Sequence, residues 1–278
     1  MPELPEMQAL AERLHDAVAG GQLESFQPLS FSALRTVTPD PATLVGHTVE
    51  GVGRRGKYLV WSFSGDLRLL VHLSQGGRVD IEKKANATRP RNGVLRLVVA
   101  GRPSVLVKEF GTERKARWWV LAGDDDGPLD RLGPEADSEA FAAFVRTSDD
   151  RRRVHTILRD QHTVAGMGRG YTDDALHRAR LSPFATLASL DPAERERLVN
   201  AIGQVLGQGL AVERRRRGGL PTKVGDHWVV HRRTAEPCPT CATSLHRVSY
   251  ESHEVTYCPG CQTGGRILAD RRLSRLLK

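Results

Sequence analysis

Residues 238–262 read CPTCATSLHRVSYESHEVTYCPGCQ, and this stretch decides how the C-terminal part of the chain folds. It contains two Cys-x-x-Cys pairs, with sixteen residues between the second cysteine and the third. Each pair can form a tight turn that presents two thiolates, so the two pairs together supply four ligands for a tetrahedral metal site. The residues between the pairs include β-prone Val248, Tyr250, Val255 and Tyr257, which favour a β-hairpin.

We therefore predict one structural zinc ion in this hairpin, and we predict no organic cofactor. A site with four protein ligands has no open coordination position, so the metal would stabilise the fold and would not do chemistry. Spacing alone also allows two disulfides or a redox pair, but the start of the chain lacks the apolar core of a signal peptide, which argues against an oxidising compartment. The predicted ligands are Cys238, Cys241, Cys258 and Cys261.

The composition indicates a protein that binds nucleic acid. The 278 residues contain 41 Lys and Arg against 33 Asp and Glu, which gives a net charge of +8 and a pI of about 9.7. A hydrophobic content of 39% allows one large core or two modest ones, and the length favours two domains. Because no long apolar run occurs, we expect a cytoplasmic, nucleoid-associated protein that does not bind membranes, and the simplest oligomeric state is a monomer.

Hydrophobic periodicity divides the chain into a helix, a β-rich region and a helical region before the cysteine pairs. Residues 4–18 have helical spacing and end at two glycines, whereas residues 22–122 contain short β-rich runs at 58–63, 67–73, 93–100 and 118–121. An antiparallel sandwich or barrel is the natural interpretation. Helical patterns return at 138–146, 150–161, 171–179 and 191–210.

The chain starts Met1-Pro2-Glu3-Leu4-Pro5-Glu6. A proline in the second position normally lets the initiator methionine be removed, which exposes a secondary amine with a reference pKa of about 8. Such an amine can attack the sugar carbon of a nucleoside and form an iminium adduct, and Glu3 beside it can supply or relay protons. Taken alone, the hexapeptide also fits the start of a well-capped helix, because acidic residues favour helix N-termini.

Five motifs, in this order along the chain, resemble the formamidopyrimidine-DNA glycosylase and endonuclease VIII family. The resemblance spans about residues 1–265, and the N-terminal motif together with the cysteine hairpin is its most specific part. The motifs are MPELPE at the start, RRGKYL at 54–59, LGPE at 132–135, QHTVAGMG at 161–168 and YCPGCQ at 257–262.

The resemblance implies an α+β fold made of an N-terminal helix, an antiparallel β-sandwich, a helix-two-turns-helix domain and a zinc β-hairpin. DNA would lie in a cleft between the domains, with the damaged nucleotide flipped out of the stack. The predicted divisions are 1–123 for the catalytic sandwich domain, 124–137 for a linker, 138–222 for the helical DNA-binding domain, 223–265 for the zinc hairpin and 266–278 for a basic extension that packs on the helical domain or contacts DNA.

The resemblance also assigns roles to single residues. Pro2 would be the nucleophile, Glu3 the acid/base and Glu6 a supporting carboxylate, while Lys57 would hold the lesion's phosphate and stabilise charge at the sugar. For Lys57 the alternative is an ordinary exposed lysine beside a strand. The predicted DNA-binding residues are His72, Gln75, Lys108, Phe110, Gly166, Gly168, Arg169 and His253.

The sequence departs from the family pattern where the family grips DNA. Arg169 replaces an asparagine and His253 an arginine, and both of the usual residues hold phosphate. Glu109 occurs where the family has an arginine, which would put a carboxylate at a phosphate-binding position. Gln75 replaces a methionine that wedges into the base stack, and Asp174 replaces a glutamate in the helix after the glycine hairpin.

The function that the resemblance implies is a bifunctional DNA glycosylase and abasic-site lyase that excises oxidised or ring-opened bases from damaged DNA. The alternative is a module of the same fold that recognises damaged DNA without cutting it, and the departures at Glu109, Arg169 and His253 are the reason to consider it. A zinc-ribbon transcription factor would explain the cysteines, but it would leave the β-rich region and the start of the chain unexplained.

Overall fold

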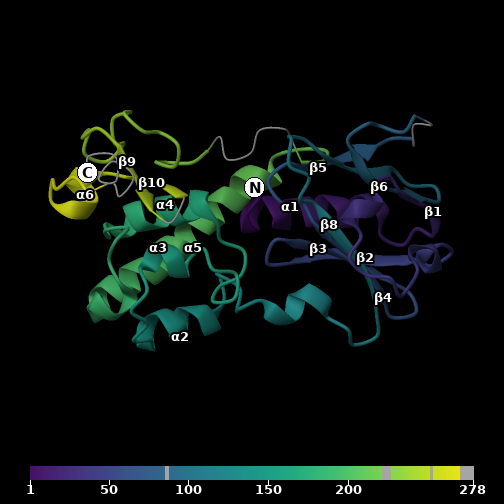
Figure 1. Cartoon of the computed structure of the whole chain (residues 1–278), viewed down its shortest axis with the longest axis horizontal. Helices are drawn as coiled ribbons and strands as arrows, with labels where there is room; N and C mark the ends of the chain where they lie inside the picture. Colours follow the sequence, from purple (N-terminus) through teal and green to yellow (C-terminus); the bar gives the residue numbers. More distant parts are fainter. Residues whose placement is uncertain (85–87, 221–226, 251–252, 270–278) are drawn as a thin grey trace. The chain divides into compact units, whose positions relative to one another are not determined.

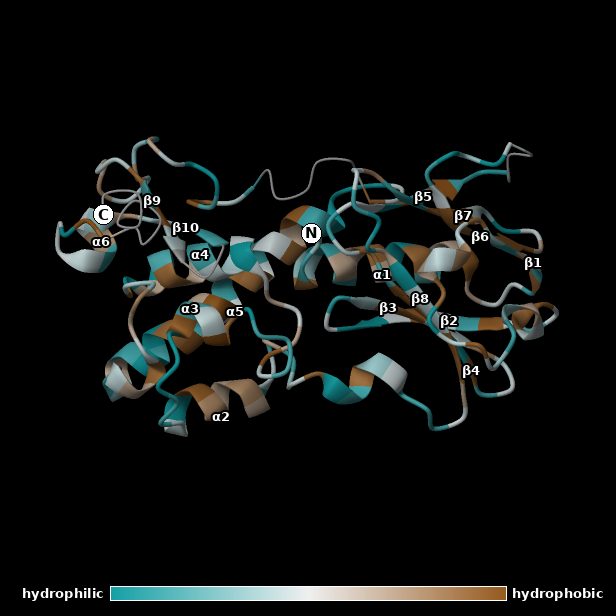
Figure 2. Cartoon of the chain, in the orientation of Figure 1, coloured by the Kyte–Doolittle hydropathy of each residue, from teal (hydrophilic) through white to brown (hydrophobic). Residues whose placement is uncertain are grey.

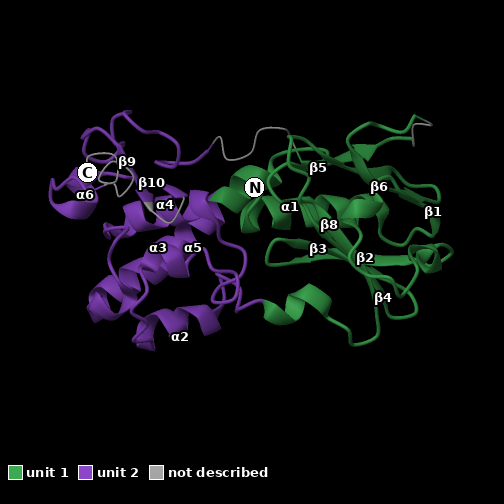
Figure 3. Cartoon of the chain, viewed as in Figure 1, with its two compact units in different colours: residues 1–131, 209–224 green, residues 132–208, 225–278 purple. Residues whose placement is uncertain are grey.

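The computed structural model describes residues 1–84, 88–220, 227–250 and 253–269, and Figure 1 shows its helices and strands. The chain packs into two compact units (Figure 3). The first unit contains Met1–Arg131 and Gly209–Val224, and the second contains Leu132–Gln208 and Gly225–Lys278. Helix α5 (Pro192–Arg214) therefore contributes most of its length to the second unit and its last residues to the first. The domain boundaries given by the sequence stay a prediction.

Helix α1 (Leu4–Val18) confirms the helix expected at residues 4–18. Glu3 is its N-cap residue and forms a reciprocal capping box with Glu6, which satisfies backbone N–H groups that have no partner inside the helix. The helix ends before Gly20, whose positive φ of 79° lets the chain turn without steric cost. Its apolar positions recur at helical spacing and are all buried, and they are Leu4, Met7, Leu10, Leu14 and Val18.

The first unit is an antiparallel β-sandwich, which confirms the fold class expected from the sequence. Its two four-stranded sheets have the orders β2-β3-β4-β8 and β1-β6-β7-β5. Side chains from both sheets and from α1 join one hydrophobic core, in which Trp61 and Trp118 are the largest members. The strands are β1 (Leu23–Pro28), β2 (Val49–Arg55), β3 (Tyr58–Phe63), β4 (Leu67–His72), β5 (Gly77–Glu82), β6 (Gly93–Val99), β7 (Ser104–Glu109) and β8 (Arg117–Ala122).

The strands that the sequence predicted are those with a clear hydrophobic pattern. Runs at 58–63, 67–73, 93–100 and 118–121 correspond to β3, β4, β6 and β8. Along β3, every second residue is buried, as a strand with one face on the core requires. Figure 2 shows brown and teal alternating along strands of this unit. The predicted runs did not include β1, β2, β5 and β7. Glycines and charged residues interrupt the patterns of β2 and β5.

In the second unit, α2 (Glu139–Thr147) and α4 (Arg169–Ala179) confirm two of the expected helices. The helix expected at 150–161 is wrong in length, because α3 (Val154–Ile157) is a single turn. The Asp150 carboxylate accepts the backbone N–H of Arg152, and the Asp160 carboxylate accepts that of His162. Such local side-chain bonds compete with the helical hydrogen-bond pattern and limit the helix to one turn.

The cysteine-rich segment forms the expected hairpin, in which β9 (His246–Tyr250) pairs antiparallel with β10 (His253–Tyr257) before the short helix α6 (Pro259–Thr263). Beyond it, the backbone N–H of Leu268 donates to the Tyr257 hydroxyl at 2.8 Å, and the Leu268 side chain packs beside Val248 and Val255. The start of the basic extension therefore packs on the hairpin. Residues 270–278 of the extension lie outside the described residues.

Two adjacent aspartates of α4 attach the hairpin region to the helical core. The Asp174 carboxylate accepts the backbone N–H groups of residues 229, 230 and 231, at 2.8, 2.9 and 3.2 Å. The Asp173 carboxylate is bonded to His231 Nδ1 at 2.6 Å and accepts the N–H of Thr256 at 3.1 Å. Asp174, which replaces the glutamate usual in the family, thus has a defined structural role as a hydrogen-bond acceptor.

Among the described residues, no helix combines the length and apolarity needed to cross a membrane.

We predict that Asp174→Ala lowers the free energy of unfolding by about 2–4 kcal/mol, because three backbone N–H groups lose their acceptor in a region where water has little access. Thermal and denaturant unfolding of the whole chain would measure the change. Asp149→Ala, which removes an exposed carboxylate of the same unit, is the matched control and should change little. Equal stability of the two variants would contradict the anchoring role of Asp174.

Candidate functional site

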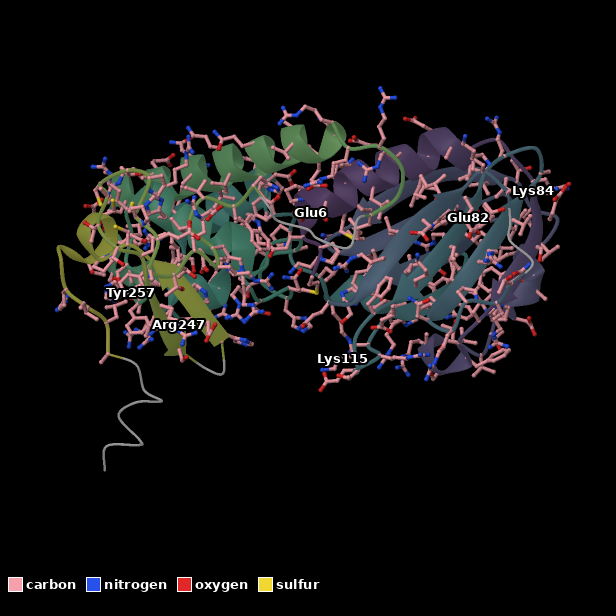
Figure 4. All side chains as sticks on the ribbon, turned by 90° about the horizontal axis from the view of Figure 1, so that it is seen from above. Glu6, Glu82, Lys84, Lys115, Arg247 and Tyr257 are labelled. Carbon is pink, nitrogen blue, oxygen red and sulfur yellow. The ribbon has the colours of Figure 1, made fainter. Side chains whose placement is uncertain are left out.

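The first turn of α1 holds a cluster of buried acidic groups. The backbone N–H of Glu3 donates to Glu6 Oε2 at 2.8 Å, and the two glutamates are 4% and 1% exposed. Pro2 is also buried, and Figure 4 shows Glu6 on α1. Burying a carboxylate is costly unless it is hydrogen-bonded, so this pair is held in one arrangement. The three N-terminal residues selected from the sequence are therefore all buried at the start of α1.

Lys57 lies in the tight turn between β2 and β3, and its side chain is 4% exposed. The alternative of an ordinary exposed lysine is therefore wrong. Gly56 before it has a φ of 54°, which glycine adopts without strain. Burial and the nearby charge of Lys57 lower the pKa of His72 to about 4, and the His72 ring packs against that of Tyr58 in a tilted arrangement, with 4.8 Å between ring centroids. Lys57 and His72 therefore lie together, with His72 neutral at pH 7.

A second set of contacts holds α1 from its polar side. The Arg13 guanidinium donates to the backbone oxygens of Gly218 at 2.7 Å and Glu213 at 2.9 Å, and Arg214 donates twice to the carboxylate of Glu12. The Glu213 side chain is fully buried, and a carboxylate oxygen of Glu213 lies within 4.8 Å of one of Glu6. Sequence reasoning missed these residues, because nothing in the local pattern links residues about 200 positions apart.

Three of the residues selected for DNA contact lie at the ends of β5 and β7. Gln75 and Phe110 both line a hollow of about 340 Å³, and Phe110 is 44% exposed. Lys108 forms an ion pair with Asp80, and its Nζ lies 5.6 Å from the centroid of the Phe110 ring. An exposed aromatic ring beside a cation suits stacking on a nucleobase.

The structure corrects the expectation for Glu109. Its side chain is only 5% exposed, so its carboxylate does not occupy a phosphate-binding position. Oε1 accepts the backbone N–H groups of Lys115 and Ala116 instead, at 2.6 and 2.8 Å. The sequence suggested that the Glu109 carboxylate would be an unfavourable charge at the surface. It is instead an internal hydrogen-bond acceptor.

The glycine hairpin leads directly into the N-terminus of α4. The side chain of Gln161 bridges the hairpin: its amide donates to the Met167 backbone oxygen at 2.8 Å, and its oxygen accepts the N–H of Gly166 at 3.0 Å. Gly168 is the N-cap residue of α4, and Arg169 is the first helical residue. A helix N-terminus attracts anions, so this arrangement is suited to a phosphate. His253, the remaining selected residue, begins β10 and is partly buried.

The four cysteines form one cluster, in which each offers a sulfur within 4.8 Å of the others. Three of the Sγ–Sγ distances are 3.4, 3.4 and 3.9 Å. A disulfide requires about 2.05 Å, whereas a tetrahedron with Zn–S bonds of about 2.3 Å has edges of about 3.8 Å. The donor set therefore fits zinc, and the disulfide alternative does not fit. His177 of α4 places Nε2 3.2 Å from the sulfur of Cys238, a contact that orients this thiolate.

Comparison with known proteins places this arrangement in a class. Residues 1–109 match the model of the formamidopyrimidine-DNA glycosylase N-terminal domain, and residues 132–218 match that of the formamidopyrimidine-DNA glycosylase H2TH domain. The formamidopyrimidine-DNA glycosylase of Chloroflexus aurantiacus is 32% identical over 94% of this chain and 98% of its own length, and that of Moorella thermoacetica is 34% identical over 89% and 94%. The chain belongs to the formamidopyrimidine-DNA glycosylase family.

Other relatives cover the chain in part or share its fold. An uncharacterized formamidopyrimidine-DNA glycosylase-like protein of Mycobacterium tuberculosis is 43% identical over 53% of this chain and 94% of its own length. The Lactococcus lactis Fpg in complex with an abasic site containing DNA has a TM-score of 0.82 at 23% identity, over 94% of this chain and 99% of that one. A variant of the same protein with a Fapy-dG containing DNA has a TM-score of 0.81 at 24% identity. At these identities the likeness shows the fold.

We predict that the imidazole of His72 stays neutral between pH 5 and pH 8, because burial and the Lys57 charge disfavour its protonated form. Proton NMR of the histidine ring signals, assigned with His72→Gln, would give the titration midpoint. Lys57→Met should raise that midpoint, since it removes the repelling charge. A His72 midpoint near the ordinary value of about 6.5 would contradict this local geometry.

We also predict that Cys258→Ser lowers the zinc content from about one ion per chain to near zero, because three thiolates hold zinc more weakly than four. Elemental analysis after purification in zinc-containing medium would measure it. Glu236→Gln, a surface change beside the first cysteine pair, is the control and should keep the metal. A wild-type protein that purifies without zinc and keeps its folded hairpin would contradict a structural zinc.

Proposed function

We propose that this protein is a DNA-repair glycosylase with an associated abasic-site lyase activity, which removes oxidised or ring-opened bases. The observation that carries the proposal is that Glu3, Glu6 and Lys57 are all buried, with Glu3 and Glu6 hydrogen-bonded to each other at the start of α1. Ionisable groups that are buried without an evident structural need are candidates for catalytic residues. Family membership gives the reaction class to which these groups would contribute.

In the proposed reaction, the Pro2 amine, free after removal of Met1, attacks C1′ of the damaged nucleotide. The bond between C1′ and the base nitrogen breaks, and the base leaves with a proton. Glu3 would protonate the sugar ring oxygen, so that the ring opens and a positively charged iminium links Pro2 to the sugar. Loss of a C2′ proton then breaks the bond between C3′ and the phosphate oxygen, and water hydrolyses the iminium to release the protein.

The other groups would support this chemistry by position and charge. Glu6 holds the N–H of Glu3, and it would fix the turn that carries the amine. Lys57 would bind the phosphate next to the lesion and favour the developing negative charge. Because His72 is neutral at pH 7, it would contact DNA as a hydrogen-bonding or stacking group without charge.

Damaged DNA is the proposed partner, and the net charge of +8 supports it. The α4 N-terminus with Arg169 would hold backbone phosphate, and a guanidinium can do so with two parallel hydrogen bonds. Gln75, Lys108 and Phe110 would occupy the space that a flipped nucleotide leaves in the stack. The zinc bound by the cysteines would keep the hairpin folded, so that His253 is presented on an ordered strand.

The decisive experiment is reduction with borohydride during single turnover on duplexes that carry one oxidised base, one ring-opened base or one abasic site. Borohydride reduces the iminium to a stable amine, so the enzyme should become covalently attached to DNA. Glu3→Gln and Lys57→Ala should slow this attachment about a hundredfold, because each removes proton transfer or charge stabilisation. Lys84→Ala, an exposed lysine of the same unit shown in Figure 4, is the matched control.

The second candidate function is recognition of damaged DNA without cleavage, and it is favoured if the Pro2 amine stays covered by Met1. Intact-mass spectrometry of the purified protein distinguishes the two at once. Retained Met1, together with tight binding and no covalent adduct on any of the three substrates, would replace the glycosylase proposal by this one. A family member known to form the adduct, run in parallel, shows that the trapping conditions work.

A further inference from the structure

Glu109 holds together the two ends of the loop between β7 and β8. It is the last residue of β7, and its Oε1 accepts the N–H groups of Lys115 and Ala116 just before β8 begins. Ala116 is 1% exposed, so its N–H has little access to water as an alternative partner. One carboxylate oxygen therefore fixes where the loop of residues 110–116 leaves the β1-β6-β7-β5 sheet and enters the β2-β3-β4-β8 sheet.

The first residue of this loop is hydrogen-bonded to the turn of residues 74–76. The N–H of Phe110 donates to the Gly76 oxygen at 2.9 Å. A Cβ atom added to Gly76 would lie 2.0 Å from the Phe110 oxygen, so only glycine allows this approach. Ser74 has a φ of 52°, a conformation that a non-glycine residue keeps only when its surroundings impose it. We call residues 74–76 and 110–116 together the double loop.

The double loop presents side chains suited to an unpaired base. Gln75 and Phe110 line the hollow of about 340 Å³, together with Thr112 and Lys115, and Figure 4 shows Lys115 at the periphery of this unit. The ring of Phe110 provides a stacking surface, and the amide of Gln75 can donate to and accept from a base edge. When a damaged nucleotide leaves the stack, its former partner is the base that needs such contacts.

We propose that Glu109 is a positioning residue that determines how the protein engages the base opposite the lesion. The inference rests on the proposed function, since it requires a duplex with one nucleotide out of the stack. Glu109 is buried and does not touch DNA; it acts through the double loop by fixing Phe110 and Gln75. The residue that the family pattern suggested to weaken DNA binding would thus control selectivity.

The experiment measures binding to duplexes with a non-cleavable tetrahydrofuran abasic site opposite each of the four bases, and opposite 2-aminopurine, whose fluorescence rises when it unstacks. Glu109→Ala should reduce the ratio between the strongest and weakest of the four affinities by about fivefold, the equivalent of about 1 kcal/mol of base stacking. It should also reduce the fluorescence change at saturating protein.

Three further variants separate positioning from general destabilisation. Glu109→Gln keeps one carbonyl oxygen for the two N–H groups, and it should restore wild-type selectivity. Thr36→Val is the matched control, because it removes one side-chain acceptor of a backbone N–H, that of Val120 at 2.9 Å, elsewhere in the same unit. It should leave selectivity unchanged. If Glu109 acts in part through Phe110, then adding Glu109→Ala to Phe110→Ala should have a smaller effect than Glu109→Ala has alone.

The inference is overturned if Glu109→Ala keeps the wild-type ratio of affinities while Phe110→Ala loses it, or if the two substitutions have additive effects. Circular dichroism confirms that each variant is folded. Failure of the proposed function is a separate result, because the abasic analogue cannot react and the affinities do not depend on catalysis. A wild-type protein that gives no covalent adduct, but whose selectivity depends on Glu109, would contradict only the glycosylase proposal.

Discussion

The burial of α1 constrains where the first residues of the chain lie. Its apolar face contributes Met7, Leu10 and Leu14 to the sandwich core, and each such side chain stabilises the packed helix by about 1.5–3 kcal/mol. Apolar packing fixes which face is inward, but it defines the position along the helix axis less sharply. The hydrogen bonds of Arg13 to the backbone of residues 213 and 218 supply that second restraint. The turn with Glu3 and Glu6 therefore has one position relative to the sheets.

Buried carboxylates organise the backbone at several places in this protein. Glu6 accepts the N–H of Glu3, Glu109 accepts two amides at the base of a loop, and Asp174 accepts three amides in the segment before the cysteine pairs. A carboxylate suits this task because its two oxygens accept several hydrogen bonds in different directions. Charge-assisted bonds are also stronger than those between neutral groups. Acidic residues at unexpected positions of this sequence therefore have structural roles as hydrogen-bond acceptors, which their negative charge alone does not reveal.

Hydrogen bonds to a buried carboxylate also attach the cysteine hairpin to the helical core of the second unit. Asp173 binds His231 and Thr256, which lie before and after the first cysteine pair in sequence, and His177 contacts the sulfur of Cys238. All three interactions start from one face of α4, which also begins at the glycine hairpin. The cysteine cluster and the glycine hairpin are therefore attached to the same helix within the second unit.

The sequence by itself determined the features that depend on local patterns: α1, the strands β3, β4, β6 and β8, the paired cysteines and the glycine hairpin. It also selected Glu3, Glu6 and Lys57, because their motifs are short and continuous. It could not show that Glu109 faces inward or that Glu213 lies near Glu6. A side chain's partner depends on segments that are distant along the chain, and only folding brings their backbone N–H groups and carboxylates within hydrogen-bond distance. The tertiary structure alone decided these roles, since burial makes an unbonded polar group costly and so selects the arrangement in which each acid finds its donors.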